Sequence, residues 1–141
     1  MNNILIVDDE PNIVMSLEYL MRSNGLDVSI ARNGTEAIEQ LENKRFNLVL
    51  LDITMPDVDG YEICQLIKNT PDWAATHVVF LSAKSKQSDI EKGMALGATD
   101  YIVKPFSTKE LSARILNLNT AKTNLKTIMN TAYIAAFDQS I

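Results

Sequence analysis

Five polar residues of the chain are of types that could carry out chemistry together: Asp8, Asp9, Asp52, Ser82 and Lys104. Carboxylates that are packed together repel one another, and a divalent cation with oxygen ligands, such as Mg²⁺, relieves that repulsion. A lone ammonium group opposite them would then pair with an anion. Carboxylates, Mg²⁺, a hydroxyl group and a lysine are together the groups used for phosphoryl transfer, which depends on positioning and charge neutralisation.

Short apolar runs precede these residues and predict the strands that position them. The runs are Ile4–Val7, Val28–Ala31, Leu48–Leu51, Val78–Leu81 and Tyr101–Val103. Continuous apolar runs are typical of strands that are buried on both faces, hence of a parallel sheet. Helical patterns lie between them, with start signals at Asn33, Asp59 and Ser107 and with Gly25 and Gly97 as stops.

This alternation of strand and helix predicts a doubly wound α/β fold with a five-stranded parallel sheet and helices on both faces. In such sheets ligands bind at the carboxyl ends of the strands, where all five polar residues fall. Each residue alone has a plainer interpretation: a helix cap for Glu10, a solubilising loop residue for Asp52, a solvated lysine for Lys104. Their joint occurrence at successive strand ends favours a functional site.

Composition narrows the function classes. The chain has 141 residues, 46% of them hydrophobic and 22% charged, which is typical of one globular domain. Its 18 acidic and 13 basic residues give a net charge of −5, which argues against a nucleic-acid-binding surface. No apolar run is long enough to cross a membrane, and no secretion signal is visible, so we expect a cytoplasmic protein without a membrane partner.

Soft metal ligands are scarce. Cys64 is the only cysteine and His77 the only histidine, so the sequence predicts neither an internal disulfide nor a zinc site. A Ser/His/Asp or Cys/His catalytic arrangement is also not expected, because His77 precedes its strand and lies at the opposite edge of the sheet. A metal in this protein would have to be a hard, oxygen-bound ion.

Four segments together resemble the receiver domain of two-component response regulators, of the chemotaxis-regulator type. They are residues 4–11 (ILIVDDEP), 50–60 (LLDITMPDVDG), 81–84 (LSAK) and 97–106 (GATDYIVKPF), and the resemblance covers roughly residues 2–119. It implies a flavodoxin-like strand order, 2-1-3-4-5. It also implies a phosphorylation-activated switch that accepts a phosphoryl group from a histidine kinase or phosphotransfer protein, rather than an enzyme with a turnover substrate.

The resemblance assigns a role to each matching residue. Asp52 would be the phosphoacceptor, Asp9 a direct Mg²⁺ ligand, Asp8 a ligand largely through metal-bound water, and the Thr54 carbonyl a backbone ligand. Ser82 and Lys104 would contact the phosphoryl oxygens, and Tyr101 would be the switch aromatic that turns inward as Ser82 moves. Thr54 and Lys84 fall where the family tunes self-dephosphorylation, and the Lys104–Pro105 bond is expected to be cis.

One subfamily of these domains, the receivers of transcription factors, dimerises through its fourth helix, fifth strand and fifth helix. Lys92 with Glu110 and Asp100 with Arg114 match two of its three ion pairs, whereas Thr99 and Leu116 stand where the third would be. The resemblance therefore implies a homodimer promoted by phosphorylation. The alternative is that these four charged residues are simply solvated.

Two other function classes fit a doubly wound sheet. A flavin or dinucleotide binder needs a Gly/Ser/Thr-rich loop after the first strand, but the loop here is Asp8-Asp9-Glu10, which would repel phosphate. An aspartyl-phosphate hydrolase resembles Asp-x-Asp-x-Thr at that point, from which this loop departs. The lifetime of a phosphorylated product distinguishes a regulator from a hydrolase. A receiver that has lost phosphorylation is not expected, because the site residues are all present.

We expect a receiver domain over residues 1–119 and a helical extension, or the start of a linker to an output domain, over 120–141. Apolar residues in steps of four and three favour a helix that continues past residue 119 as a lever: Leu111, Ile115, Leu118, Leu125, Met129, Ala132 and Ala136. The alternatives are that this segment folds back onto its own domain or frays. The output target and the cognate kinase are not apparent from the sequence.

Overall fold

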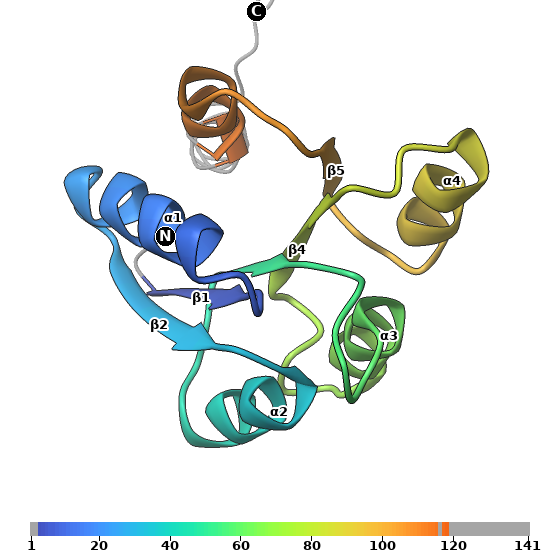
Figure 1. Ribbon diagram of the computed structural model, residues 1–141. Helices are drawn as coiled ribbons and strands as arrows, with labels where there is room; N and C mark the ends of the chain where they lie inside the picture. The colour runs from blue at the N-terminus through green and yellow to red at the C-terminus, as the bar shows by residue number, and fades with distance from the viewer. Residues whose placement is uncertain (1–2, 116, 119–141) are drawn as a thin grey trace, which may run out of the picture. The chain divides into compact units, whose positions relative to one another are not determined.

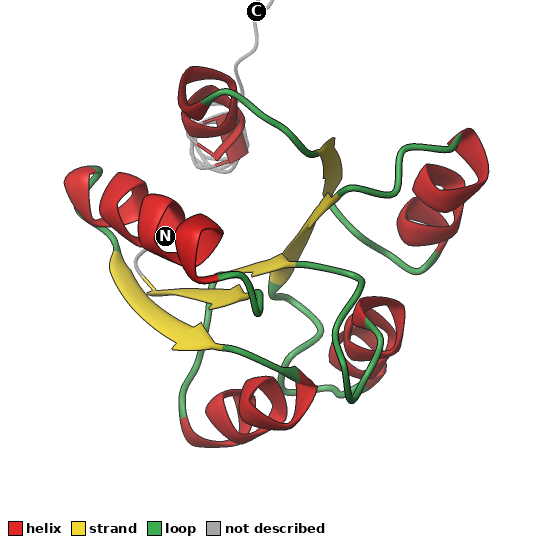
Figure 2. Cartoon of the chain, in the orientation of Figure 1, coloured by secondary structure: helices red, strands yellow, loops and turns green. Residues whose placement is uncertain are grey.

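The computed structural model describes residues 3–115, 117 and 118. Its strands are β1 (Asn3–Val7), β2 (Asp27–Ala31), β3 (Leu48–Leu51), β4 (His77–Ser82) and β5 (Asp100–Val103), and its helices are α1 (Pro11–Ser23), α2 (Gly34–Asn43), α3 (Gly60–Asn69) and α4 (Gln87–Ala95). A last helix begins at residue 108. All strands are parallel in the order β2-β1-β3-β4-β5, so the predicted fold class is confirmed (Figures 1 and 2).

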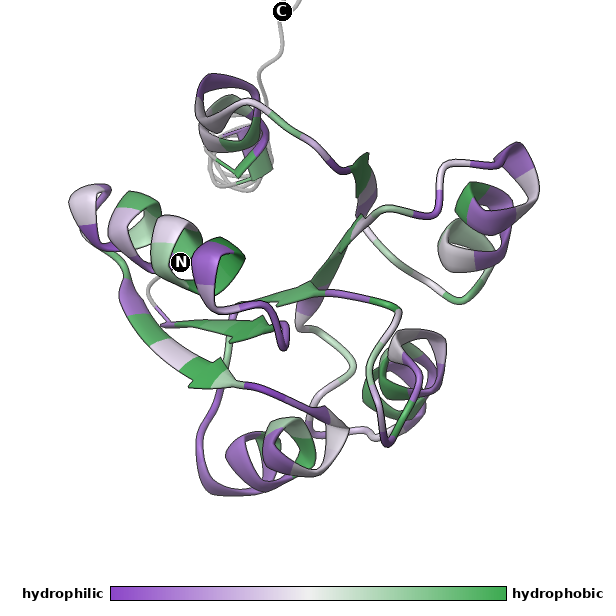
Figure 3. Cartoon of the chain, viewed as in Figure 1, coloured by the Kyte–Doolittle hydropathy of each residue, from purple (hydrophilic) through white to green (hydrophobic). Residues whose placement is uncertain are grey.

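The alternation of side chains along the strands explains why the runs are continuously apolar. One set of positions in β1, β3 and β4, including Leu5, Val49 and Phe80, belongs to a core with side chains of α2 and α3. The intervening positions are also buried, and α1 lies on that face with Val14, Leu17 and Met21 buried. Both faces are therefore covered, and Figure 3 shows β1, β3 and β4 in hydrophobic colours.

Side-chain caps fix where three of the helices begin, as predicted. The Asn33 side chain accepts a hydrogen bond from the Glu36 amide at 2.9 Å. Asp59 accepts one from the Tyr61 amide and forms a capping box at the start of α3, and Ser107 Oγ accepts one from the Glu110 amide at 2.9 Å. These caps place the loops that precede them at the carboxyl edge of the sheet.

One expectation about α1 is corrected by the structure. Glu10 occupies the N-cap position, but its side chain makes no capping hydrogen bond. The backbone amide of Glu10 donates to Asp8 Oδ1 at 3.0 Å. The polar loop after β1 is therefore organised by Asp8.

Glycine is required where the chain turns or approaches itself closely. Gly25 and Gly97, the predicted helix stops, have φ of +80° and +103°. A Cβ at Gly60 would collide with the Asp52 carbonyl oxygen and lie 2.7 Å from Ile53 Cα. The start of α3 is thereby packed against the backbone that carries Asp52.

The chain divides into two compact units, Met1–Phe106 and Ser107–Ile141. The first contains the sheet and α1–α4, and in the second the described helix has an ion pair between Glu110 and Arg114 at 3.9 Å.

The Lys104–Pro105 bond is cis, as expected. The helical lever predicted beyond residue 119 lies outside the described residues. In the described part of the chain, no helix is long and apolar enough to span a membrane.

We predict that Gly60→Ala lowers the free energy of unfolding by about 2 kcal/mol, as expected when an added methyl group has no room. Gly25→Ala is the control, because nothing lies within 4 Å of its added Cβ and only backbone strain of about 1 kcal/mol opposes it. Urea unfolding followed by circular dichroism measures both. Equal losses in the two variants would contradict the close approach at Gly60.

Candidate functional site

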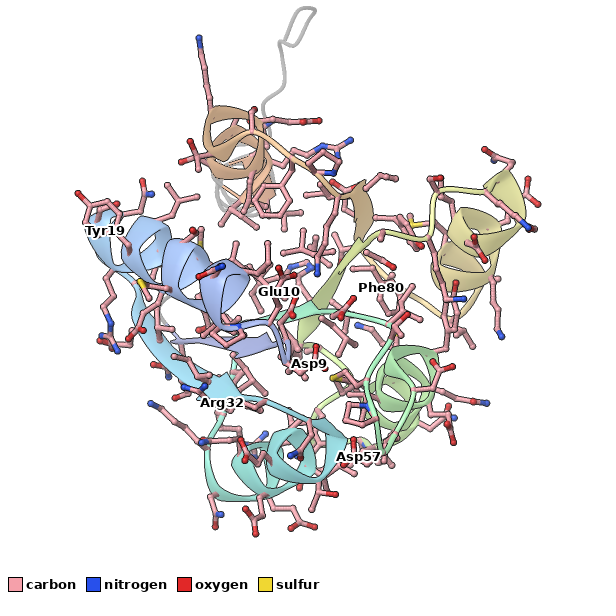
Figure 4. All side chains as sticks on the ribbon, in the orientation of Figure 1. Asp9, Glu10, Tyr19, Arg32, Asp57 and Phe80 are labelled. Atoms are coloured by element: carbon pink, nitrogen blue, oxygen red, sulfur yellow. The ribbon has the colours of Figure 1, made fainter. Side chains whose placement is uncertain are left out.

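Three carboxylates meet at the carboxyl edge of the sheet. Asp8 and Asp9 follow β1 and Asp52 follows the adjacent strand β3, so parallel pairing brings them together. One carboxylate oxygen from each lies within 4.8 Å of the other two. Asp8 and Asp52 are buried, at 2% and 7% exposure, whereas Asp9 is exposed at the mouth of the site (Figure 4). The sequence predicted this cluster, and the structure brings all three residues together.

Lys104 supplies the opposing positive charge. It follows β5, and its Nζ lies 2.8 Å from Asp8 Oδ2 and 3.7 Å from Asp52 Oδ1. The lysine side chain is only 15% exposed, so water screens these contacts weakly. A single ammonium thus offsets part of the repulsion among the carboxylates and leaves the cluster net negative.

The surroundings of Asp52 disfavour its charged form. Burial, which penalises the charged carboxylate, is the main reason that the pKa of Asp52 rises to about 6. Lys104 lowers this pKa, while Asp8 and Asp9 raise it. The Ile53 amide donates to Asp52 Oδ1 at 2.8 Å and also favours the charged form. Added positive charge beside Asp52 would therefore be stabilising.

The donor set fits a hard divalent cation. Mg²⁺ is usually held by one or two carboxylates with several waters, and Asp8, Asp9 and Asp52 offer oxygen atoms at a suitable mutual spacing. Thr54 lies two residues after Asp52, in the loop between β3 and α3, with an exposed side chain. Its assignment as a backbone ligand remains a prediction.

Ser82 and Tyr101, the residues predicted to form the switch, meet at the backbone of Lys84. Ser82 ends β4 and is 1% exposed, and its Oγ accepts the Lys84 amide at 3.1 Å. The Tyr101 hydroxyl donates to the Lys84 carbonyl oxygen at 2.7 Å. Tyr101 is 6% exposed, so the aromatic ring is turned inward in this structure.

For three further residues around Tyr101, namely Tyr61, Phe80 and Gly93, the sequence predicted no role in the site. The ring of Phe80 lies between those of Tyr61 and Tyr101, with centroid separations of 5.6 and 5.7 Å. The Tyr61 hydroxyl donates to the Asp89 carbonyl of α4 at 3.0 Å. A Cβ at Gly93 of α4 would lie 3.0 Å from Phe80 and 3.1 Å from Tyr101. Helix α4 thus packs directly on the rings, a role that spacing alone does not indicate.

Asp57 is another residue for which the sequence predicted no role. It lies in the loop after β3, next to the first turn of α2 (Figure 4), where its carboxylate accepts the amides of Gly34 and Thr35, each at 2.9 Å. These bonds hold the pKa of Asp57 well below its usual range. A second acid five residues after Asp52 is the only signal in the sequence, and it does not identify a partner on another helix.

Comparison with known proteins agrees with this geometry. The sequence model of a protein family, the response regulator receiver domain, matches residues 4–116 of the chain. The chain belongs to this family. It is 46% identical over 112 residues to a probable transcriptional regulator, ycf27, of Porphyridium aerugineum, covering 79% of this chain and 45% of that protein. It is 38% identical to PhoP of Bacillus subtilis, the alkaline phosphatase synthesis transcriptional regulatory protein, covering 79% and 46%.

Solved structures of receiver domains have a backbone fold similar to that of this chain. A CheY-like receiver domain of Methanospirillum hungatei has a TM-score of 0.79 at 28% identity, covering 88% of this chain and 98% of that one. DrrB, a Thermotoga maritima OmpR/PhoB homologue, has a TM-score of 0.79 at 32% identity, covering 86% and 54%. Receiver domains are phosphorylation-activated signalling switches of two-component systems, interact with histidine kinases and generally bind Mg²⁺. This receiver spans about half the length of the curated relatives it matches.

We predict that Asp52→Asn stabilises the metal-free protein at pH 7 by up to about 3 kcal/mol, because it removes a buried charge whose folded-state pKa is raised from 3.8 to about 6. A raised carboxyl pKa makes wild-type stability fall as pH rises from about 4 to about 6. The advantage of the variant should therefore be full above pH 6 and vanish near pH 4. Thermal melts in EDTA across that range test this; an advantage that grows toward low pH would contradict it.

Proposed function

We propose that this receiver domain takes a phosphoryl group from a phosphohistidine of a histidine kinase or phosphotransfer protein onto Asp52, in the cytoplasm. The observation that carries the proposal is the position of the Asp52 carboxylate, which lies within 4.8 Å of carboxylate oxygens of Asp8 and Asp9 and 3.7 Å from the ammonium of Lys104. A nucleophilic carboxylate with cationic partners is the arrangement that phosphoryl transfer requires. The exposed Asp9 marks the side from which a donor would approach.

In the transfer, a carboxylate oxygen of Asp52 forms a bond to phosphorus while the bond from phosphorus to the donor imidazole nitrogen breaks. The bonding electron pair returns to the imidazole. Asp8, Asp9, Asp52 and the Thr54 carbonyl would hold Mg²⁺, and the chemistry that this ion supplies is neutralisation of charge on the phosphoryl oxygens. Lys104, now paired with Asp8 at 2.8 Å, would turn to a phosphoryl oxygen.

The acyl phosphate would also be the signal. It places nearly two negative charges in a site that already contains Asp8 and Asp9. The Ser82 hydroxyl would leave the Lys84 amide and donate to a phosphoryl oxygen, while the inward Tyr101 ring keeps the Lys84 carbonyl in place. A small change at Asp52 is thus passed to the loop between β4 and α4.

Thr54 and Lys84 are proposed to set the rate at which the phosphoryl group is lost, because both flank the site and both are exposed. The domain promotes its own phosphorylation and dephosphorylation and has no turnover substrate. An aspartyl-phosphate hydrolase, the competing class, would release phosphate repeatedly. Residues 1–119 would form the receiver and residues 120–141 the connection to an output segment, with no nucleic acid bound by the receiver itself.

We predict that Asp52→Asn abolishes phosphate incorporation, because Asp52 matches the phosphoacceptor of the receiver family and lies beside Lys104 and the other two acids. The measurement is labelled acetyl phosphate with Mg²⁺, followed by acid quench and separation of the protein. Wild-type protein should take up about one phosphoryl group per chain. Asp72→Asn serves as the control, since it removes an exposed carboxylate that lies outside the acidic cluster, and it should still be labelled.

Label that persists on the Asp52 variant would contradict the assignment of the phosphoacceptor. Continuous release of phosphate by wild-type protein, many equivalents per chain without accumulation of labelled protein, would favour the hydrolase. Labelling that is unaffected by EDTA would contradict the metal site. Circular dichroism of the variant confirms that it remains folded.

The charged residues Lys92, Asp100, Glu110 and Arg114 are proposed to form a homodimer face after phosphorylation. Their sequence positions match two ion pairs of the dimerising subfamily. Exposed ion pairs contribute only about 0–1 kcal/mol each, so the dimer should be weak and sensitive to salt. Within one chain Glu110 already pairs with Arg114 and Lys92 lies 4.4 Å from the centroid of the Tyr61 ring, and dimerisation would have to compete with both contacts.

We predict that sedimentation velocity with a beryllofluoride mimic of the phosphoryl group gives a dimer at low salt, because charge pairing between chains is then least screened. Lys92→Glu should weaken it, and Lys92→Glu combined with Glu110→Lys should restore it. A monomer at high protein concentration with beryllofluoride bound would count against the dimer, as would a double variant no better than the single one.

A further inference from the structure

The loop between β3 and α3 is attached to a second helix. Asp57 Oδ1 accepts the Gly34 amide at 2.9 Å, and Oδ2 accepts both the Thr35 amide at 2.9 Å and the Thr35 hydroxyl at 2.8 Å. Asp57 Oδ1 also accepts the amide of Val58 at 2.7 Å, which fixes the carboxylate relative to its own backbone. One side chain therefore joins this loop to the N-terminus of α2.

Glycines at the start of α2 and at the start of α3 contact the two ends of this loop. A Cβ at Gly34 would lie 2.5 Å from Val58 Cβ and 3.3 Å from Asp57 Oδ1, so only glycine allows α2 to approach the loop this closely. At the other end, the Gly60 amide donates to the Ile53 carbonyl at 2.9 Å. The segment in between, which includes Thr54, is thus held at both ends.

We propose that Asp57 is a positioning residue for the metal site, acting through the loop that carries Thr54. This inference rests on the proposed function, in which the Thr54 carbonyl and the carboxylates of Asp8, Asp9 and Asp52 hold Mg²⁺. Mg²⁺ requires near-ideal octahedral geometry, so it is sensitive to the placement of each ligand. Without the contacts of Asp57, the loop has to be ordered when the metal binds, and that ordering reduces affinity.

Charge supports the same assignment. The hydrogen bonds from Gly34 and Thr35 keep the pKa of Asp57 well below its usual range, so the carboxylate remains an acceptor at every pH near neutrality. An amide in its place would have to turn an NH₂ group toward one of the donors. Asp57→Asn therefore breaks part of the attachment with almost no change in side-chain volume.

The experiment is calorimetric titration of the full chain with MgCl₂ alone, without a phosphodonor. Loss of a group that supports a metal ligand usually costs 10–100-fold in metal affinity, and we expect the Mg²⁺ dissociation constant of Asp57→Asn to rise by about tenfold. With acetyl phosphate, the variant should recover wild-type labelling at saturating Mg²⁺. Measurements at high salt remove the long-range effect of the lost charge, and the difference should persist there.

Two further variants separate positioning from stability and from charge. Asn33→Ala removes the other side-chain cap of α2, which bonds the Glu36 amide and makes no hydrogen bond to the loop, so it should destabilise the protein but leave the Mg²⁺ dissociation constant unchanged. Gly34→Ala retains every charge but adds a Cβ against Val58, so it should weaken Mg²⁺ binding severalfold.

The outcomes are distinguishable. Weaker Mg²⁺ binding in Asp57→Asn and Gly34→Ala, with wild-type affinity in Asn33→Ala, supports the proposal. Wild-type affinity in Asp57→Asn, or an equal loss in Asn33→Ala, overturns it while leaving the proposed function intact. Wild-type protein that binds no Mg²⁺ overturns both.

Discussion

The mutual repulsion of three carboxylates at one edge of a parallel sheet is the constraint on which the other features of this receiver depend. Asp8 and Asp52 are buried beside each other because β1 and β3 are neighbours in the sheet. Lys104, which follows β5 at the edge of the sheet, reaches across to pair with Asp8, which follows β1. The fold therefore maintains an unfavourable charge distribution, and the rigid sheet that imposes it must be stabilised elsewhere.

That stabilisation comes from the fully covered sheet. Apolar side chains fill both faces of β1, β3 and β4, so the strand ends cannot separate to relieve the repulsion without exposing the core. The carboxylates are therefore held close together despite their repulsion, which favours the binding of a cation among them. The close approach of Gly60 to the backbone of Asp52 adds a steric restraint at the same point.

The sequence predicted the strands and the polar residues at their carboxyl ends. Strand ranges could be predicted to within one residue at each end because buried parallel strands are continuously apolar, and Asp8, Asp9, Asp52 and Lys104 could be predicted to converge because parallel strands end at a common edge. Asp57 could not be linked to α2 in this way, since contacts between loops depend on backbone geometry that hydrophobic periodicity does not encode.

The packing of aromatic rings is the other feature that the sequence pattern does not encode, and it links the site to α4. The inward Tyr101 ring packs closely on Gly93, where an added Cβ would press on both Phe80 and Tyr101. Tyr61 holds the same helix through the Asp89 carbonyl. Outward movement of Tyr101 would leave a void beside Phe80, which costs free energy unless α4 shifts to fill it. The position of α4 and the orientation of Tyr101 are therefore coupled by packing, and Ser82, whose hydroxyl shares the Lys84 backbone with Tyr101, brings that coupling within reach of Asp52.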